Sequence, residues 1–109
     1  MIRHIRNVLR PEEVAHLVEL AKSVRFVDGR ATNPDSTIKL NQQVPQNDPG
    51  AAEPGLLIRD ALFRHPAVRA FALPKQMARP TMARYEPGMT YGWHVDEALF
   101  PSNPPMRSD

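Results

Sequence analysis

The chain has 109 residues, of which 24% are charged and 41% are hydrophobic, as is typical of one small folded domain. The formal net charge is only +2, and basic residues are scattered from Arg3 to Arg107 without the cluster that a nucleic-acid binder needs. No apolar run is long enough to span a bilayer, and the lack of cysteine excludes disulfides, thiolate metal sites and cysteine nucleophiles. We therefore expect neither a nucleic acid nor a membrane as a partner.

The amino-terminal segment, residues 1–6, contains basic residues but no continuous apolar stretch follows them, so it does not resemble a signal peptide. The lack of cysteine is consistent with a reducing compartment. Together, these features predict a cytoplasmic protein.

The first predicted helix begins at Pro11, which suits the first helical position. Glu12 and Glu13 follow where carboxylates favour the positive end of the helix dipole. Apolar residues then recur at helical spacing, at Val14, Leu17, Val18 and Ala21. This pattern predicts an amphipathic helix with one apolar stripe.

Two strands are predicted in the next part of the chain. Residues 25–27 form a short strand that enters a turn at Asp28-Gly29. Residues 38–44 alternate well enough for a second strand. One face of that strand carries Ile38, Leu40 and Val44, and the other carries Lys39, Asn41 and Gln43.

Proline and glycine shape the middle of the sequence. Three prolines and two glycines in residues 45–55 predict a loop. A second helix is predicted over residues 56–64, ending before Pro66. A short helical turn over residues 67–72 is closed by Pro74.

The last third of the chain favours strands. Residues 81–85 and 90–96 are predicted strands, and Glu86-Pro87-Gly88 between them fits a type II turn. Alternation in the second strand puts Tyr91, Trp93 and Val95 on one face and Gly92, His94 and Asp96 on the other. We expect the aromatic side chains of the first face to pack in the core.

His94 and Asp96 are the candidate metal ligands. A strand projects them side by side, with Gly92 clearing space beside them, as two adjacent ligands of a facial site would require. The 2-His-1-carboxylate arrangement with open positions is typical of non-haem Fe(II) oxygenases. The tripeptide alone also fits an ordinary hydrogen-bonded surface pair.

The surrounding sequence is more specific. Residues 84–96, RYEPGMTYGWHVD, closely resemble the iron-binding segment of the prolyl-4-hydroxylase-like Fe(II)/2-oxoglutarate dioxygenases, and most of all their bacterial PKHD-type hydroxylase branch. Glu97-Ala98 continues the match to the family pattern Y-G-x-H-V-D-x-A. Three further segments fall in the family's order: FVDGR at 26–30, K-x-N-x-Q at 39–43 and MRSD at 106–109.

The resemblance implies an α+β fold in which amino-terminal helices precede the first strands of a double-stranded β-helix, or jelly roll. Residues 1–75 would form the helical and strand region, and residues 76–109 the first part of the β-helix core. The implied cofactors are Fe(II), the cosubstrate 2-oxoglutarate and L-ascorbate, with O2 as the oxidant.

The resemblance also implies residue roles. His94 and Asp96 would be the first two iron ligands. Tyr85 matches a tyrosine that lines the 2-oxoglutarate pocket, although a half-buried core tyrosine would give the same pattern. Lys39, Asn41 and Gln43 either border the substrate cleft or form a solvated strand face.

The sequence departs from the family at its end. The second iron histidine and the basic residue that binds the far carboxylate of 2-oxoglutarate should lie several dozen residues beyond Asp96, and only thirteen residues follow it. We therefore expect an amino-terminal portion of the enzyme that is inactive alone. Unpaired strand edges would favour homo-oligomers.

Two other functional classes remain open from the sequence. One is a binding or assembly module that keeps half of the fold and needs no iron. The other is a metal-dependent hydrolase or isomerase that uses His94 and Asp96 with a different third ligand. The substrate, whether a small molecule or a peptide, is not specified by the sequence.

Overall fold

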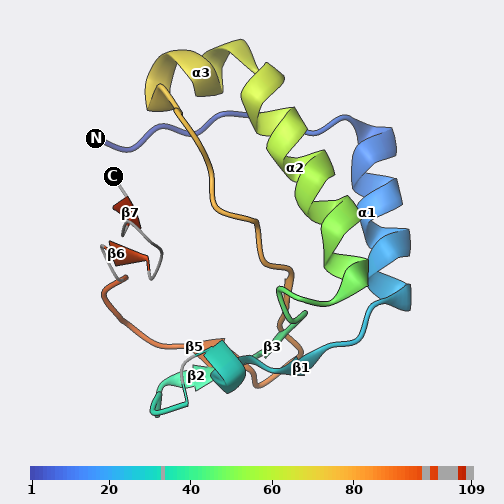
Figure 1. The fold of residues 1–109 in the computed structure, drawn as a ribbon, viewed down its shortest axis with the longest axis vertical. Helices are drawn as coiled ribbons and strands as arrows, with labels where there is room; N and C mark the ends of the chain where they lie inside the picture. Colours follow the sequence, from blue (N-terminus) through green and yellow to red (C-terminus); the bar gives the residue numbers. More distant parts are fainter. Residues whose placement is uncertain (33, 97–98, 101–105, 108–109) are drawn as a thin grey trace.

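The computed structural model describes residues 1–32, 34–96, 99–100 and 106–107, and it has an α+β fold with helices beside small antiparallel sheets (Figure 1). The helices are α1 (Pro11–Ser23), η1 (Gly29–Thr32), η2 (Pro49–Ala51), α2 (Ala52–Arg64) and α3 (Pro66–Ala72). The strands are β1 (Val27–Asp28), β2 (Lys39–Leu40), β3 (Gln42–Gln43), β4 (Ala83–Arg84), β5 (Thr90–Tyr91), β6 (Leu99–Phe100) and β7 (Met106–Arg107).

Helix α1 starts at Pro11, as predicted. The backbone N–H of Arg10 donates to the Glu13 carboxylate at 2.8 Å, which pairs one of the amide groups at the helix start. The apolar stripe is only partly covered, because Val14 and Val18 are 46% and 53% exposed. Packing on this helix is therefore limited, and polar contacts link it to α2.

The Glu13–Arg64 ion pair joins α1 to the end of α2. Arg64 Nη1 donates to Glu13 Oε2 at 2.9 Å, and Arg64 Nη2 donates to the other carboxylate oxygen. A second contact between the same helices joins His16 Nε2 to Glu53 Oε1 at 2.7 Å. The two helices lie side by side in Figure 1.

Helix α2 begins four residues earlier than predicted, so the loop expected over residues 45–55 is wrong at its carboxyl end. The Asp48 side chain accepts from the Gly50 N–H at 2.8 Å and starts the short η2 turn, which runs directly into α2. Pro54 is tolerated because it lies in the first helical turn, where its missing N–H costs no hydrogen bond. The predicted short helix α3 is confirmed and starts at Pro66.

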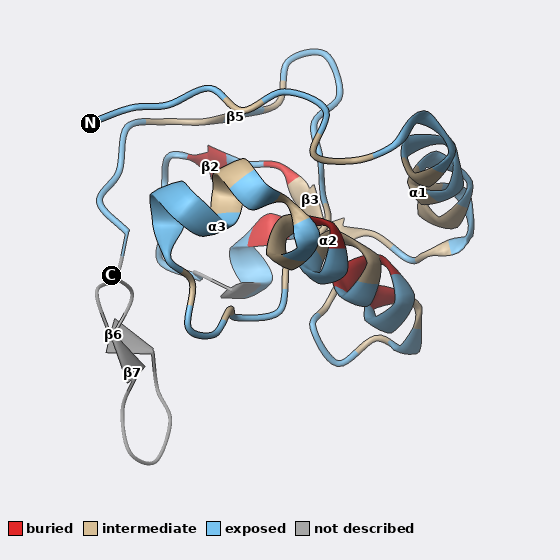
Figure 2. Ribbon diagram, turned by 90° about the horizontal axis from the view of Figure 1, so that it is seen from above, coloured by how far each residue is buried: buried red, intermediate tan, exposed pale blue. Residues whose placement is uncertain are grey.

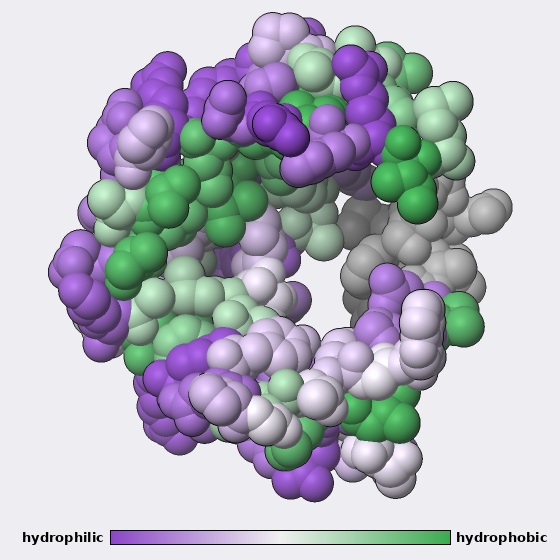
Figure 3. Space-filling model, turned by 180° about the vertical axis from the view of Figure 1, so that it is seen from behind, coloured by the Kyte–Doolittle hydropathy of each residue, from purple (hydrophilic) through white to green (hydrophobic). Residues whose placement is uncertain are grey.

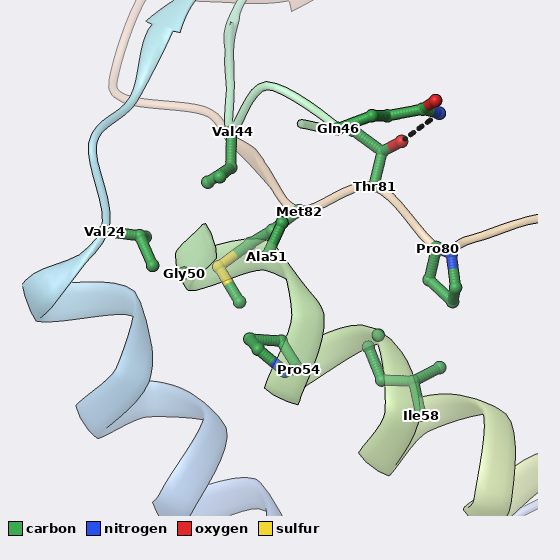
Figure 4. A pocket seen from close by; sticks show the side chains of 11 residues that line it. Val24, Val44, Gln46, Gly50, Ala51, Pro54, Ile58, Pro80, Thr81 and Met82 are labelled. Carbon is green, nitrogen blue, oxygen red and sulfur yellow. Dashed lines mark hydrogen bonds between the residues drawn. The ribbon is translucent and has the colours of Figure 1, made fainter. Parts of the chain in front are cut away.

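The core is small. Among the described residues its buried apolar side chains are Val44, Ala51, Pro54 and Ala61, and the buried residues gather in α2 and around β2 and β3 (Figure 2). A pocket lies where the end of α1, the start of α2 and residues 80–82 meet, and Val24, Val44, Pro54, Ile58 and Met82 line it (Figure 4). Seen from behind, the molecule is hollowed near its middle, with hydrophobic side chains along part of the wall (Figure 3).

The predicted strand over residues 38–44 is divided in two. Asn41 separates β2 from β3, and the two pieces pair with different partners. Strand β2 pairs with β5, with Lys39 opposite Tyr91, whereas β3 lies between β1 and β4. One segment of chain therefore connects two sheets.

The turn after β4 is confirmed as type II. The Met89 N–H donates to the Glu86 carbonyl at 2.9 Å, and Gly88 has φ of 89°, a value that favours glycine at this position. The strands on either side of the turn do not pair with each other, because β4 adds to β3 and β5 adds to β2. In the described part of the chain, no helix has the length and apolar character needed to cross a membrane.

The Glu13–Arg64 ion pair predicts an acid-dependent loss of stability. The Arg64 guanidinium, followed by the Arg10 backbone N–H, lowers the pKa of Glu13 from 4.5 to about 2. The folded-state pKa is below the unfolded one, so the stabilisation is complete above about pH 4.5 and is lost as the pH falls towards 2. We expect Glu13→Gln to unfold at lower denaturant concentration than the wild type at pH 7, and this difference to close on acidification.

Circular dichroism at several pH values measures this difference. Glu12→Gln changes the neighbouring exposed carboxylate and is the matched control, for which we expect a much smaller effect. A wild-type advantage over Glu13→Gln that stays constant from pH 7 to about pH 2 would contradict the role of the ion pair.

Candidate metal centre

His94 and Asp96 are the paired donors of the candidate site. His94 Nε2 lies 3.2 Å from Asp96 Oδ1, and His94 Nδ1 lies 2.8 Å from the Gly92 carbonyl oxygen. A carbonyl oxygen only accepts, so Nδ1 donates to it, and Nε2 is the nitrogen that is left to face a metal beside Asp96. This is the orientation that a metal-binding histidine usually has, with its second nitrogen bonded to a backbone carbonyl.

These donors fit a metal ion. Two ligands at right angles, each about 2.1 Å from an ion, are about 3.0 Å apart, close to the 3.2 Å between Nε2 and Oδ1. The two side chains are accessible, since the Asp96 side chain is 92% exposed and that of His94 is 33% exposed. Among the described residues, no group of three histidine or carboxylate side chains forms a complete metal site. The described residues therefore bring together two candidate metal donors.

Tyr91 packs on the candidate ligand, which differs from the alternation expected over residues 90–96. The Tyr91 and His94 rings are stacked, with centroids 3.8 Å apart and planes 15° apart. Strand β5 ends at Tyr91, so the period of two does not extend to His94. For the same reason Trp93 is fully exposed, and the prediction that it packs in the core is wrong.

Lys39 and Asn41 are buried, at 6% and 4% exposure, whereas Ile38 and Leu40 on the other face are 43% and 53% exposed. The interpretation of this polar face as solvated is therefore wrong for these two residues. Lys39 Nζ lies 5.2 Å from the centroid of the Tyr91 ring, within the range of a cation–π contact. Gln43 is half-buried in the other sheet, opposite Val27 and Ala83.

Asn41 connects this buried face to Tyr85. Asn41 Nδ2 donates to the Tyr85 hydroxyl oxygen at 2.9 Å, across 44 residues of sequence. Gly29 makes room for the amide, because a Cβ atom at position 29 would lie 1.7 Å from Asn41 Oδ1 and 3.1 Å from Lys39 Cε. Contacts thus run from Tyr85 through Asn41, Gly29 and Lys39 to Tyr91, which stacks on the candidate ligand.

Two features of this region were not predicted as part of the site. Tyr91 was assigned to the core because the strand alternation was continued past the end of β5. The only sequence signal for the stacking is that Tyr91 comes three residues before the candidate ligand His94. Arg30, which follows the predicted Asp28-Gly29 turn, donates to both carboxylate oxygens of Asp28, at 3.1 and 2.7 Å. This pair, with the Arg30 backbone N–H, lowers the pKa of Asp28 from 3.8 to about 2.

Comparison with known proteins identifies relatives of the chain. No protein-family model matches it. A PKHD-type hydroxylase of Burkholderia ambifaria strain MC40-6 is 42% identical over 115 aligned residues, which cover 100% of this chain and 51% of that protein. PKHD-type hydroxylases of Paracoccus denitrificans and Shewanella baltica strain OS155 are each 40% identical over 101 residues, covering 91% of this chain and 44% and 45% of those proteins.

The chain spans about half the length of these curated relatives. The matches nevertheless extend along 91% to 100% of the chain itself, from the helices to the segment that carries His94 and Asp96. The chain is therefore homologous to PKHD-type hydroxylases, which it matches along 91% to 100% of its own length.

Proposed function

We propose that the chain forms part of the active site of an Fe(II)- and 2-oxoglutarate-dependent hydroxylase. The observation that supports this most directly is the position of His94 Nε2, 3.2 Å from Asp96 Oδ1 with Nδ1 held by a backbone carbonyl. A histidine and a carboxylate that converge in this way are two members of the facial triad of non-haem iron oxygenases. The relatives' name, hydroxylase, supports the same reaction class.

In this proposal His94 and Asp96 hold Fe(II), which when bound supplies the activation of O2 that couples 2-oxoglutarate decarboxylation to hydroxylation, with L-ascorbate keeping it reduced. The Gly92 carbonyl fixes the His94 tautomer, and Tyr91 restricts the rotation of the imidazole ring. The protein's part is to hold the two donors in place before the metal and substrates arrive.

Tyr85 is the proposed contact for a carboxylate of 2-oxoglutarate. Tyr85 is 51% exposed and its hydroxyl accepts a hydrogen bond from Asn41 on one side, so a ligand can reach the residue from solvent. Lys39 and Asn41 form the buried polar wall next to Tyr85 and Tyr91, and we assign them, with Gln43 further along the segment, to the border of the substrate cleft. The substrate is a small molecule or a peptidyl group with a C–H bond to be hydroxylated.

We further propose that the strands described here belong to a double-stranded β-helix. The division of the chain between two sheets on either side of Asn41 supports this arrangement, since a jelly roll is built of two sheets connected in this manner. Residues 1–75 then form the helical and strand region of the dioxygenase domain, which includes β1 to β3, and residues 76–109 form the first part of the β-helix core.

The ligand assignment predicts that His94→Ala abolishes turnover. The assay uses a chimaera in which this chain replaces the matching residues of the Burkholderia ambifaria PKHD-type hydroxylase, and it measures succinate formed with Fe(II), 2-oxoglutarate and ascorbate. Asp96→Asn should also abolish succinate formation, because a neutral amide is a poor ligand for a cation. Circular dichroism checks that the variants remain folded.

His4→Ala is the matched control, since it removes an exposed imidazole from the amino-terminal segment. We expect this control to retain the activity of the parent chimaera. Succinate formation at the parent rate in His94→Ala, or a parent chimaera that binds zinc tightly and ignores 2-oxoglutarate, would contradict the proposed function.

The cosubstrate contact predicts that Tyr85→Phe raises the KM for 2-oxoglutarate more than it lowers kcat. A hydrogen bond to a charged group contributes about 1.5–3 kcal/mol, so KM should rise about tenfold or more. The same chimaera assay gives both constants. An unchanged KM together with lower thermal stability would favour a packing role for Tyr85.

The 109-residue chain alone should not turn over 2-oxoglutarate. Its described residues bring together only two candidate ligands, which leaves most positions on a metal to solvent and gives weak retention. Size-exclusion chromatography with the succinate assay tests this directly. Iron-dependent turnover by a monomer of this chain would mean that it contains the third ligand, and His4, His16 and His65 would then be the residues to replace.

A further inference from the structure

The Asn41 amide is a buried polar group with one hydrogen bond and one end unpaired. Nδ2 donates to the Tyr85 hydroxyl oxygen at 2.9 Å, whereas the buried Oδ1 has no hydrogen-bond partner among the residues that the structure describes. Asn41 is 4% exposed, so bulk water does not reach the amide. A polar group buried in this state calls for an explanation, and one explanation is a role in a functional site.

The direction of this hydrogen bond follows from the chemistry of its surroundings. Oδ1 lies against Gly29, where no described residue donates a hydrogen bond to its lone pairs. The opposite orientation of the amide would put its N–H groups in this unpaired position, and an unpaired buried N–H is rarer than an under-satisfied carbonyl. Nδ2 therefore faces Tyr85, and the Tyr85 oxygen accepts.

A tyrosine oxygen that accepts from a fixed amide keeps its own proton for another partner. An amide nitrogen has no lone pair to offer, so the Tyr85 O–H cannot donate to Nδ2. The exposed side of Tyr85 thus presents a donor. A donor suits a carboxylate, and the bond from Asn41 also makes the hydroxyl a stronger donor through hydrogen-bond cooperativity.

We propose that Asn41 is a positioning residue that fixes the Tyr85 hydroxyl as a hydrogen-bond donor to the carboxylate of the anionic cosubstrate. This inference rests on the proposed function, in which Tyr85 contacts 2-oxoglutarate. The buried Asn41 acts on the cosubstrate only through Tyr85 and does not contact the cosubstrate itself. Gly29 serves the same role indirectly, since its backbone N–H donates to the Asn41 carbonyl at 2.9 Å and its missing Cβ leaves space for the amide.

Asn41→Asp is the decisive substitution because it keeps the shape of the side chain and reverses its polarity. A carboxylate at this position only accepts, so the Tyr85 hydroxyl would turn to donate to it and offer lone pairs to the cosubstrate. In the chimaera assay we expect the KM for 2-oxoglutarate to rise about tenfold or more, with a smaller change in kcat. Asn41→Ala removes the bond without adding charge and should give a smaller rise in KM.

Gln42→Glu is the matched control for an added charge. It introduces the same carboxylate one residue away, on a side chain that already bonds the Arg84 guanidinium at 2.7 Å. We expect its KM for 2-oxoglutarate to stay within about twofold of the parent value. An equal rise in KM for Gln42→Glu and Asn41→Asp would contradict the inference, because the effect would then be one of charge alone.

Nuclear magnetic resonance of the whole 109-residue chain tests the hydrogen bond without any activity. Tyr85→Phe removes the acceptor, so the side-chain amide protons of Asn41 should exchange with water faster than in the wild type. Gly29→Ala should have the same effect, because its Cβ would displace the amide. Unchanged exchange in both variants would overturn the inference even if Asn41→Asp fails to fold.

The two proposals fail in different ways. If Tyr85→Phe leaves the KM for 2-oxoglutarate unchanged, the proposed contact of Tyr85 is wrong and the inference falls with it. If Tyr85→Phe raises KM but Asn41→Asp and Asn41→Ala do not, only the role of Asn41 is wrong. A rise in KM in the order parent, Asn41→Ala, Asn41→Asp supports both.

Discussion

The fold around the candidate site depends on how the segment over residues 38–44 pairs. This segment has two partners, β5 for its first half and the β1–β4 pair for its second half, and the change occurs at Asn41. A residue at such a junction belongs to neither of the two strand ladders. Its side chain can therefore form a hydrogen bond with a residue outside them. Asn41 uses this position to reach Tyr85, and Lys39 on the same segment reaches Tyr91.

The burial pattern of this segment is the reverse of that in an ordinary strand. Lys39 and Asn41 are covered, whereas Ile38 and Leu40 are open to solvent. Burial of apolar surface alone would favour the opposite orientation of the segment, with Ile38 and Leu40 covered. The polar contacts of the buried face and the sheet register must therefore outweigh the free energy lost by exposing these apolar side chains. Such local conflicts between pattern and structure are expected where residues are selected for a site.

The helices and turns were predictable because their signals are local. Pro11 and Pro66 mark helix starts, and Pro87-Gly88 specifies the type II turn through the positive φ of glycine. The partners of the strands were not predictable, because two-residue strands hold too little pattern to define a register. The approach of His94 to Asp96 was predictable from their spacing, but Tyr91 was placed on the wrong face because β5 ends before the alternation can reach His94.

The exposure of Trp93 has an optical consequence. It is the only tryptophan of the chain, and it precedes His94 directly with its side chain fully in water. Indole emission from the whole protein therefore arises one residue from a candidate ligand, in the most polar environment available. Fluorescence of this chain is therefore a local signal from the candidate site, and a paramagnetic ion held by His94 and Asp96 would quench it without any added label.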